Sequence, residues 1–290
     1  MLKGFSLPDE AIEKLSGDDV KTIMILGTSD SGKTTLVGEL AKFFAPRKKT
    51  GILDVDPGQS HIGPPTTVAW AQVEDKFESW DRLKVRDFYF VGDVSPRGNL
   101  LPLTVGARLM WDKANKLVER IIVDTTGLVR GEIGKVLKLN LIDILRPEVI
   151  FALFKENELD HILAFFKNVK VPAIFKIPSP PEVKIKDFSE RRTYRKLRFK
   201  SYFKEARDIE FFQQDVGLDK IFPSQSLDSS LVSLRDKNNQ DIALGIIKRF
   251  DRVNRTVIIY SPITNPEKVG RVVVGRLKLT VEEIQISAVE

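Results

Sequence analysis

The chain has 290 residues, of which 42% are hydrophobic and 30% are charged, so one large domain or two small ones can form around an apolar core. It has no cysteine and only two histidines, His61 and His161, which argues against disulfide frameworks, zinc fingers and zinc hydrolases. The net charge of +6 permits nucleic acid as a partner without requiring it. No apolar run approaches the length of a membrane span and the N-terminus lacks a signal-peptide pattern, so we expect a cytoplasmic protein with no membrane contact.

After a short polar lead-in over residues 1–20, apolar runs typical of strands alternate with helical patterns. This alternation predicts an α/β fold over residues 21–208, in which a parallel sheet is covered by helices on both faces. The predicted strands are Thr22–Leu26, Gly51–Val55, Asp87–Val91, Arg120–Val123, Glu148–Leu153 and Pro172–Ile177. The helical patterns between them are Thr34–Phe44, Leu101–Val118, Gly131–Leu145 and Leu159–Phe166.

The pattern changes after the proline-rich run at residues 178–181, which ends the last of these strands. Basic residues greatly outnumber acidic ones between Lys184 and Arg207, and the composition from Ser189 to about Arg207 favours a helix. Short strands follow, and they predict a small antiparallel β module over residues 209–290. These strands are Ile242–Arg249, Thr256–Tyr260 and Arg271–Leu279.

One motif predicts phosphate binding directly. The run from Gly27 to Thr35 fits G-x-x-x-x-G-K-[ST], with an apolar strand before it and a helix after it, as a P-loop NTPase requires. Its glycines let backbone N–H groups converge on phosphate oxygens, Lys33 reaches the β- and γ-phosphates, and Thr34 can ligate Mg²⁺. The predicted nucleotide-binding residues are Gly27, Thr28, Ser29, Asp30, Ser31, Gly32, Lys33, Thr34 and Thr35.

Two carboxylates, Asp54 and Asp56, end the second predicted strand and precede Pro57 and Gly58. A P-loop enzyme needs a carboxylate to hold Mg²⁺, and a kinase needs one to accept the proton of the attacking hydroxyl. Either aspartate could serve either purpose, and one of them could instead cap the following turn. We expect at least one to be functional.

The run from Asp124 to Gly127 ends another strand and resembles the D-x-x-G switch of GTPases. The guanine-selecting N/T-K-x-D sequence is absent after the two later strands, so guanine specificity has no support. The loop from Thr125 to Gly131 therefore either contacts a second substrate or simply connects a strand to a helix.

Helical spacing places Arg191 and Arg195 on one face of the basic helix. Arginines there can close over a triphosphate as a lid and neutralise charge on the transferred phosphoryl group. A solvated helix face and nonspecific RNA binding are the alternatives, but a structural helix would usually interleave acidic residues. We therefore expect a lid at about residues 184–207.

Together these motifs resemble the P-loop polynucleotide 5′-hydroxyl kinases, the RNA kinases related to a subunit of pre-mRNA cleavage and tRNA-splicing complexes and to a nucleolar pre-rRNA kinase. The chain is similar to a compact prokaryotic or archaeal member from about Thr22 to about Leu279. The resemblance implies transfer of the γ-phosphate of ATP, with Mg²⁺, to the 5′-OH of RNA or DNA. It rests on the phosphate loop with Asp30, on residues 54–59 and 63–66, on Gly92-x-x-Ser95-Pro96, on residues 124–131, and on the basic lid ending in Ser201-Tyr202-Phe203.

The resemblance also implies roles for individual residues. Leu128 stands where many members carry a tryptophan, so an apolar contact replaces an aromatic platform for a base. The implied catalytic residues are Lys33, Asp56, Arg191 and Arg195, and the implied metal ligands are Thr34, Asp56 and Asp54. The implied contacts to the polynucleotide are Gln59, Thr126, Gly127, Leu128, Gly131, Arg192 and Arg198. The alternative functions are an RNA-binding ATP switch or scaffold without transfer activity, and a metabolic P-loop ATPase or small-molecule kinase.

Overall fold

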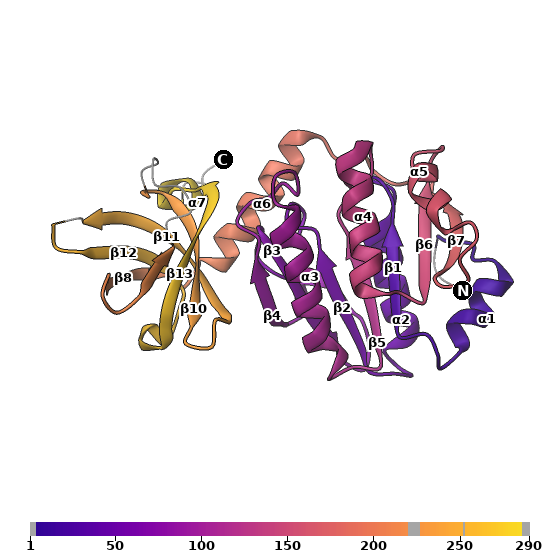
Figure 1. The fold of residues 1–290 in the computed structure, drawn as a ribbon, viewed down its shortest axis with the longest axis horizontal. Coiled ribbons are helices and arrows are strands. Elements are labelled where there is room, and N and C mark those ends of the chain that lie inside the picture. The colour runs from indigo at the N-terminus through magenta and orange to yellow at the C-terminus, as the bar shows by residue number, and fades with distance from the viewer. Residues whose placement is uncertain (1–3, 220–226, 252, 286–290) are drawn as a thin grey trace.

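The computed structural model describes residues 4–219, 227–251 and 253–285. Small parts of the predicted lead-in and β module, at residues 1–3, 220–226, 252 and 286–290, lie outside the described residues. Two sheets dominate the fold (Figure 1): a seven-stranded sheet in the order β4-β3-β2-β5-β1-β6-β7, and a six-stranded sheet in the order β8-β12-β11-β10-β13-β9. No helix of the described part is long and apolar enough to cross a membrane.

Five neighbouring strands of the first sheet are parallel. Their interior positions are buried on both faces in the central strands, which is why these segments read as continuous apolar runs. In β1, Met24 and Leu26 face one layer of core while Ile23 and Ile25 face the other, as the two-residue period of a strand requires. The five are β2 (Thr50–Val55), β5 (Arg120–Thr125), β1 (Thr22–Leu26), β6 (Val149–Phe154) and β7 (Ala173–Pro178).

The prediction of a parallel sheet is wrong at one edge, where two pairs of strands are antiparallel. A strand that we did not predict, β3 (Thr67–Val73), runs antiparallel to β2, and β4 (Val85–Phe90) runs antiparallel to β3. The connection from β2 to β3 contains no helix, so the chain returns beside β2 instead of crossing over. Because the direction reverses twice, β4 ends at the same edge of the sheet as β2.

Helices cover both faces of this sheet. The helices α1 (Asp9–Ser16) and α2 (Lys33–Phe44) bury their apolar sides against one face. The helices α3 (Leu100–Asn115), α4 (Gly131–Leu145) and α5 (Asp160–Leu163) cover the other, together with the short turn η2 (Ala164–Phe166). The short turn η1 (Trp80–Arg82) lies on the α1 and α2 side, where Trp80 packs against that layer of core. The predicted lead-in is therefore more than a polar tail, since α1 lies within it and buries Ala11 and Leu15 in the core.

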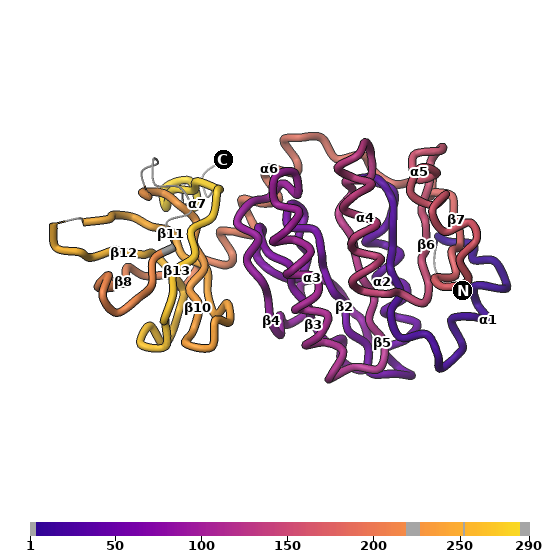
Figure 2. Tube along the Cα trace, in the orientation of Figure 1, coloured from indigo at the N-terminus to yellow at the C-terminus, as the bar shows by residue number. Residues whose placement is uncertain are grey.

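The basic segment forms α6 (Phe188–Tyr202), which lies between the two sheets after the chain has crossed the upper edge of the first one (Figure 2). A capping box starts this helix: the Asp187 carboxylate accepts from the Glu190 N–H, and the Glu190 carboxylate accepts from the Asp187 N–H. The helix ends five residues earlier than the predicted Arg207, because the chain turns at residues 203–206 to enter the second sheet.

The second sheet forms the predicted β-rich module. Its strands pair antiparallel except β9, which is parallel to β13. The elements are β8 (Arg207–Phe212), β9 (Gly217–Asp219), β10 (Ser230–Asp236), β11 (Asp241–Asp251), β12 (Thr256–Ser261), the turn η3 (Pro266–Lys268), β13 (Val269–Lys278) and the helix α7 (Val281–Gln285). The α/β class with an added β module is thus confirmed.

Backbone contacts join this module to β4 and to the loop after it. The Gly92 carbonyl accepts from the N–H groups of Arg276 and Leu277 at 2.8 and 3.1 Å. A Cβ on Gly275 would lie 2.7 Å from the Gly92 oxygen, so this contact requires glycine at position 275. Gly92, which belongs to one of the motifs on which the family resemblance rests, holds the module against the sheet.

Candidate active site

The loop between β1 and α2 has the form of an anion cradle. Asp30 and Gly32 adopt left-handed backbone conformations, with φ of 54° and 91°, and Gly32 immediately precedes α2. Such alternation turns successive N–H groups toward one point, at the positive end of the helix dipole. A Cβ on Gly27 would lie 2.4 Å from Ser31 Oγ, so the tight turn leaves room only for glycine.

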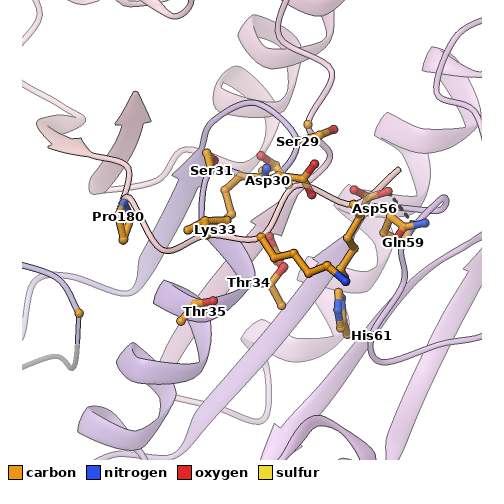
Figure 3. Close-up of a pocket in the computed structure, with 18 of the residues that line it drawn as sticks. Ser29, Asp30, Ser31, Lys33, Thr34, Thr35, Asp56, Gln59, His61 and Pro180 are labelled. Atoms are coloured by element: carbon orange, nitrogen blue, oxygen red, sulfur yellow. Dashed lines mark hydrogen bonds between the residues drawn. The ribbon is translucent and has the colours of Figure 1, made fainter. Parts of the chain in front are cut away.

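A cavity of about 450 Å³ lies over this loop. Figure 3 shows that Asp56, Gln59 and His61 lie on one side of Thr34, and Pro180 lies on the other. Phe5 and Val183 lie with Pro180 around Gly32, so that side of the cavity carries apolar side chains beside the charged Glu182 and Lys184. The cavity therefore has a polar arm and an apolar arm, joined over the phosphate loop.

The lysine and the threonine of the phosphate-loop motif lie close to a carboxylate from the neighbouring strand. Lys33 is only 7% exposed and donates to the Thr28 carbonyl at 2.6 Å. Burial lowers its pKa, and the charges of Asp124, Asp56 and Asp30 oppose that shift. The Thr34 hydroxyl donates to Asp124 Oδ2 at 2.7 Å.

Asp124 is a site residue that our sequence analysis did not assign. The available signal was an apolar strand, Ile121 to Val123, that ends in an aspartate. The sequence does not say that β5 is the strand next to β1, and this neighbourhood is what brings Asp124 to Thr34.

The two aspartates after β2 differ sharply in their contacts. Asp54 is buried, and its carboxylate accepts hydrogen bonds from the N–H groups of residues 56, 61 and 62 and from the Ser60 hydroxyl, at 2.7–3.2 Å. It therefore organises the loop that follows. Asp56 uses one oxygen, Oδ1, to accept from the N–H groups of Gly58 and Gln59, and its carboxylate lines the cavity. Of the two, Asp56 is the carboxylate that can reach a ligand.

Burial and mutual repulsion raise the pKa values of two of these carboxyl groups. Burial raises the pKa of Asp54 to about 7, and the charges of Asp124 and Asp56 add to the shift. Burial also raises the pKa of Asp124 to about 6, against the opposing effects of the Lys33 charge and the Thr34 hydrogen bond. A cation in the cavity would relieve this repulsion.

The oxygens present fit a magnesium ion only in company with a nucleotide. Within the described residues, no cluster of three or more His, Cys, Asp or Glu side chains could hold a metal by itself. Thr34, Asp124 and Asp56 supply a hydroxyl and two carboxylates on one side of the cavity. Magnesium commonly takes one or two carboxylates and completes its shell with phosphate oxygens and water, which this set allows.

The N-terminal half of the basic helix α6 lies over the cavity. Arg191 lines the cavity, forms an ion pair with Asp30 of the phosphate loop at 2.5 Å and donates to the Lys186 carbonyl. Arg195 is half-buried and forms no ion pair among the described residues; burial lowers its pKa and the Asp56 charge opposes this. Arg192 is exposed.

Arg198 is hydrogen-bonded to the loop that follows β2. Its guanidinium donates to the carbonyls of His61, Ile62 and Gly63 at 2.9–3.2 Å. The Tyr194 hydroxyl donates to the Ser60 carbonyl of the same loop at 3.1 Å. These contacts fasten α6 to the loop that carries Asp56. They use Nη2 of the guanidinium that the resemblance suggested for polynucleotide binding, while its Nε has no hydrogen-bond partner among the described residues.

The residues after β5 that the resemblance implies as polynucleotide contacts separate into two groups. Thr126 is buried, and Gly127 lines the cavity so close to the phosphate loop that a Cβ on it would lie 2.4 Å from the Ser29 nitrogen. Leu128 is half-buried and packs against the core beneath α3 and α4. Gly131 starts α4 with a φ of 70° and does not line the cavity.

Two buried polar atoms near the cavity have no hydrogen-bond partner among the described residues: Gln59 Oε1 and Ser31 Oγ. Both residues line the cavity. Buried polar atoms are normally paired, so these two are available to a ligand. This observation supports the sequence-based assignment of Ser31 and Gln59 to the site.

A glycine-rich anion cradle at the carboxyl edge of a parallel sheet, with Lys33 and Thr34 at its rim and a carboxylate on the next strand, defines a P-loop nucleotide-binding protein. The chain belongs to the family described as mRNA cleavage and polyadenylation factor CLP1 P-loop, which matches residues 27–205.

Archaeal proteins are similar to this chain over most of its length. A polyribonucleotide 5′-hydroxyl-kinase of Pyrococcus horikoshii is 34% identical over 208 residues, which are 71% of this chain and 56% of that protein. A protein of the same name from Methanocaldococcus jannaschii is 36% identical over 228 residues, 76% of this chain and 62% of the relative. The chain thus spans little more than half the length of the curated relatives that it matches.

Solved structures support the fold. The wild-type Clp1p–Pcf11p complex contains a chain similar to this one with a TM-score of 0.72 and 14% identity, covering 93% of this chain and 77% of the other. A second structure of Clp1p with Pcf11p gives a TM-score of 0.71 at 13% identity. At these identities the likeness concerns the fold alone.

Proposed function

We propose that this protein is an ATP-dependent polynucleotide 5′-hydroxyl kinase. The observation that carries the proposal is the two-armed cavity: a phosphate cradle lies at its centre, and Asp56 lies on one side of it. A donor phosphate and an acceptor hydroxyl can meet in such a cavity, whereas a nucleotide switch needs no carboxylate aimed at an acceptor. The names of the archaeal relatives agree with this activity.

The proposed reaction transfers the γ-phosphoryl group in line to the 5′-oxygen of RNA or DNA. Asp56 accepts the proton of the 5′-hydroxyl, the 5′-oxygen forms a bond to the γ-phosphorus, and the bond from that phosphorus to the bridging oxygen breaks to release ADP. Lys33 and Arg191 neutralise charge on the phosphates, with Arg195 moving in behind Arg191. Mg²⁺ would be held by Thr34, Asp124 and Asp56 with the phosphates, and would screen the charge that repels the acceptor.

The acceptor strand is proposed to enter on the Asp56 side of the cavity. Gln59 and Gly127 line the cavity and are the proposed contacts to the acceptor, while Thr126 is buried directly behind Gly127. The exposed Arg192 continues the basic surface of α6 away from the cavity, so it is suited to a backbone phosphate. Leu128, Gly131 and Arg198 support these contacts from behind through packing, helix initiation and loop anchoring.

The test is transfer of labelled γ-phosphate to matched RNA and DNA oligonucleotides with 5′-OH ends. We expect labelled product with 5′-OH acceptors and none with 5′-phosphate acceptors. Lys33→Ala and Asp56→Ala should each reduce transfer by at least about 10²-fold, since each removes charge or proton acceptance at the reacting centre. Lys42→Ala, on the exposed side of α2, is the matched control.

Other outcomes separate the alternatives. Tight ATP binding with no labelled oligonucleotide would favour an RNA-binding switch or scaffold. Equal transfer to a free nucleoside would favour a small-molecule kinase.

The apolar arm is proposed to hold the base of ATP. Because the γ-phosphate must face Asp56, the α-phosphate and base extend the other way, toward Phe5, Pro180 and Val183. Phe5→Ala should weaken ATP binding roughly tenfold by removing apolar contact with the base. Binding of inorganic tripolyphosphate, which has no base, should be unchanged. Calorimetry with both ligands tests this, and equal weakening of the two would show that Phe5 only supports the loop.

A further inference from the structure

Two long cationic side chains, Arg120 and Lys138, are completely buried. Arg120 has a clear structural task, since its guanidinium donates to the carbonyls of Leu15 and Gly17 and ties α1 to the sheet. The contacts of Lys138, on α4, are different. Burying an ammonium group is costly, and an apolar side chain would fill the same position at lower cost. Its charge therefore needs an explanation other than packing.

The ammonium of Lys138 donates to the backbone carbonyl of Thr126, at 2.5 Å. The pKa of Lys138 is lowered to about 7, chiefly by burial and also by the Lys33 charge, while the Asp56 and Asp124 charges oppose the shift. Lys138 is thus close enough to the active-site carboxylates for their charges to affect its pKa, yet it does not line the cavity. It can act on a ligand only through the groups that it holds.

The geometry of the peptide group tells what this hydrogen bond does. In a trans peptide the C=O and the following N–H point in opposite directions. The Thr126–Gly127 peptide is trans, and its carbonyl is held on Lys138. The Gly127 N–H must therefore point away from Lys138, and Gly127 lines the cavity.

The Gly127 N–H is an available donor. Within the described residues, it donates to no protein acceptor. Gly127 is half-buried, and a fixed, unpaired N–H beside a reacting centre is suited to an oxyanion. Because Gly127 packs against Ser29, this residue lies beside the phosphate loop.

The rest of the loop is held by other contacts. The Thr125 hydroxyl donates to the Ile25 carbonyl at 2.7 Å, and His161 Nε2 lies 3.0 Å from the Val129 carbonyl. The backbone of Val129 also approaches Gly134 so closely that a Cβ there would lie 2.4 Å from its carbonyl carbon. The Thr126 carbonyl, in contrast, accepts its hydrogen bond from Lys138.

We propose that Lys138 is a positioning residue: it holds the Thr126–Gly127 peptide so that the Gly127 N–H donates to an oxygen of the transferred γ-phosphoryl group. The inference rests on the proposed kinase function and assigns a further donor to the same site. It requires no contact between Lys138 and the substrate.

The wild-type protein provides a direct test by nuclear magnetic resonance. Thr-Gly pairs occur only at residues 50–51 and 126–127 of the sequence, so labelling threonine carbonyls with ¹³C and glycine nitrogens with ¹⁵N selects two amides. Gly51 lies in the buried strand β2 and serves as an internal control. With Mg²⁺ present, a non-hydrolysable ATP analogue should move the Gly127 resonance well beyond its position with ADP and leave that of Gly51 in place.

A substitution tests the role of Lys138 itself. Lys138→Met keeps the length of the side chain and removes the hydrogen bond. It should reduce the preference for the ATP analogue over ADP, measured by calorimetry, by about 10-fold or more, because a hydrogen bond to a charged oxygen is lost. ADP affinity should stay within about twofold, and kcat should fall by about 10²-fold or more. His161→Phe removes the support at Val129 and is the control: it should lower thermal stability and keep the ATP preference.

The outcomes are distinguishable. If neither nucleotide binds, both the proposed function and this inference are overturned. If both bind and the Gly127 resonance is the same with each, the inference fails and the kinase proposal stands. If Lys138→Met folds and keeps the full ATP preference, Lys138 is not the positioning residue. If that variant does not fold, the wild-type resonance measurement decides.

Discussion

At the scale of single residues, three aspartates near one another have different tasks because their contacts differ. Asp54 accepts hydrogen bonds from its own loop, Asp56 keeps its carboxylate on the cavity wall, and Asp124 accepts from Thr34. The sequence places Asp54 and Asp56 at the end of a strand and treats them as equals. Burial and the direction of each side chain decide which one a ligand can reach.

The buried carboxylates should make stability depend on pH. The pKa of Asp124 is raised to about 6 in the folded protein, so its stabilising contribution is complete below the unfolded value near 3.8 and is lost as pH rises through about 6. Asp124→Asn cannot ionise and keeps an acceptor for Thr34. Without nucleotide or Mg²⁺, raising the pH from 4 to 7 should therefore destabilise the wild type relative to this variant by on the order of 1–3 kcal/mol.

Thermal unfolding of both proteins across that pH range measures this difference. Parallel curves would contradict the assignment of a raised pKa to Asp124. Adding Mg²⁺ with an ATP analogue should restore the wild type selectively, since a bound cation compensates the carboxylate charge.

At the scale of elements, helix α6 is held at both ends. Its N-terminal half contacts the phosphate loop through Arg191 and the Asp56 loop through Arg198. Its C-terminal half buries Phe199 and Phe203 with Phe90, and the Tyr202 hydroxyl accepts from the Leu244 N–H at 2.8 Å. A basic helix fixed in this way is prepared to present arginines to the phosphates with little reorganisation.

The lid assignment predicts a specific kinetic effect. Replacing both Arg191 and Arg195 with alanine should lower kcat by about 10²- to 10³-fold, because charge on the transferred group is no longer neutralised. ADP affinity should change less, since the loss concerns the γ-phosphate. Lys204→Ala, just beyond the end of α6, is the control for general loss of positive charge. An unchanged kcat in the double variant would exclude the lid.

At the scale of the whole molecule, the β module contains a buried ion pair whose carboxylate also contacts the nucleotide-binding sheet. Arg235 and Asp241 pair at 2.8 Å with side chains 9% and 3% exposed, and Asp241 also accepts from the Phe90 N–H of β4. The module and α6 share one apolar cluster with Phe90. The position of the module therefore bears on α6 as well as on the sheet.

The ion pair gives a prediction with a built-in control. Asp241→Ala leaves the Arg235 charge buried without its partner and should destabilise the protein by about 3–5 kcal/mol. Replacing both residues with apolar ones, Arg235→Met and Asp241→Leu, should recover most of that loss. Urea unfolding of the two variants measures the difference. Equal destabilisation would mean that the carboxylate matters through the Phe90 N–H and not through the pair.

Much of the fold and site is readable from the chain. The Gly27–Thr35 pattern, the two-residue and helical periods and the basic segment predict the phosphate loop, the parallel strands, the lid helix and the β module. These features depend on neighbours in sequence, so local patterns carry them. The same reasoning missed β3, because the direction of a strand depends on its partner and not on its own composition.

Other features arise only when distant segments meet. Strand order brings Asp124 to Thr34, helix packing buries Lys138 beneath Thr126, and the return of α6 occupies Arg198 with the loop at residues 61–63. Long-range contacts and burial set these relations, and a one-dimensional pattern does not contain them. The residue types of this site are thus written in the sequence, while the choice among similar residues comes from their three-dimensional surroundings.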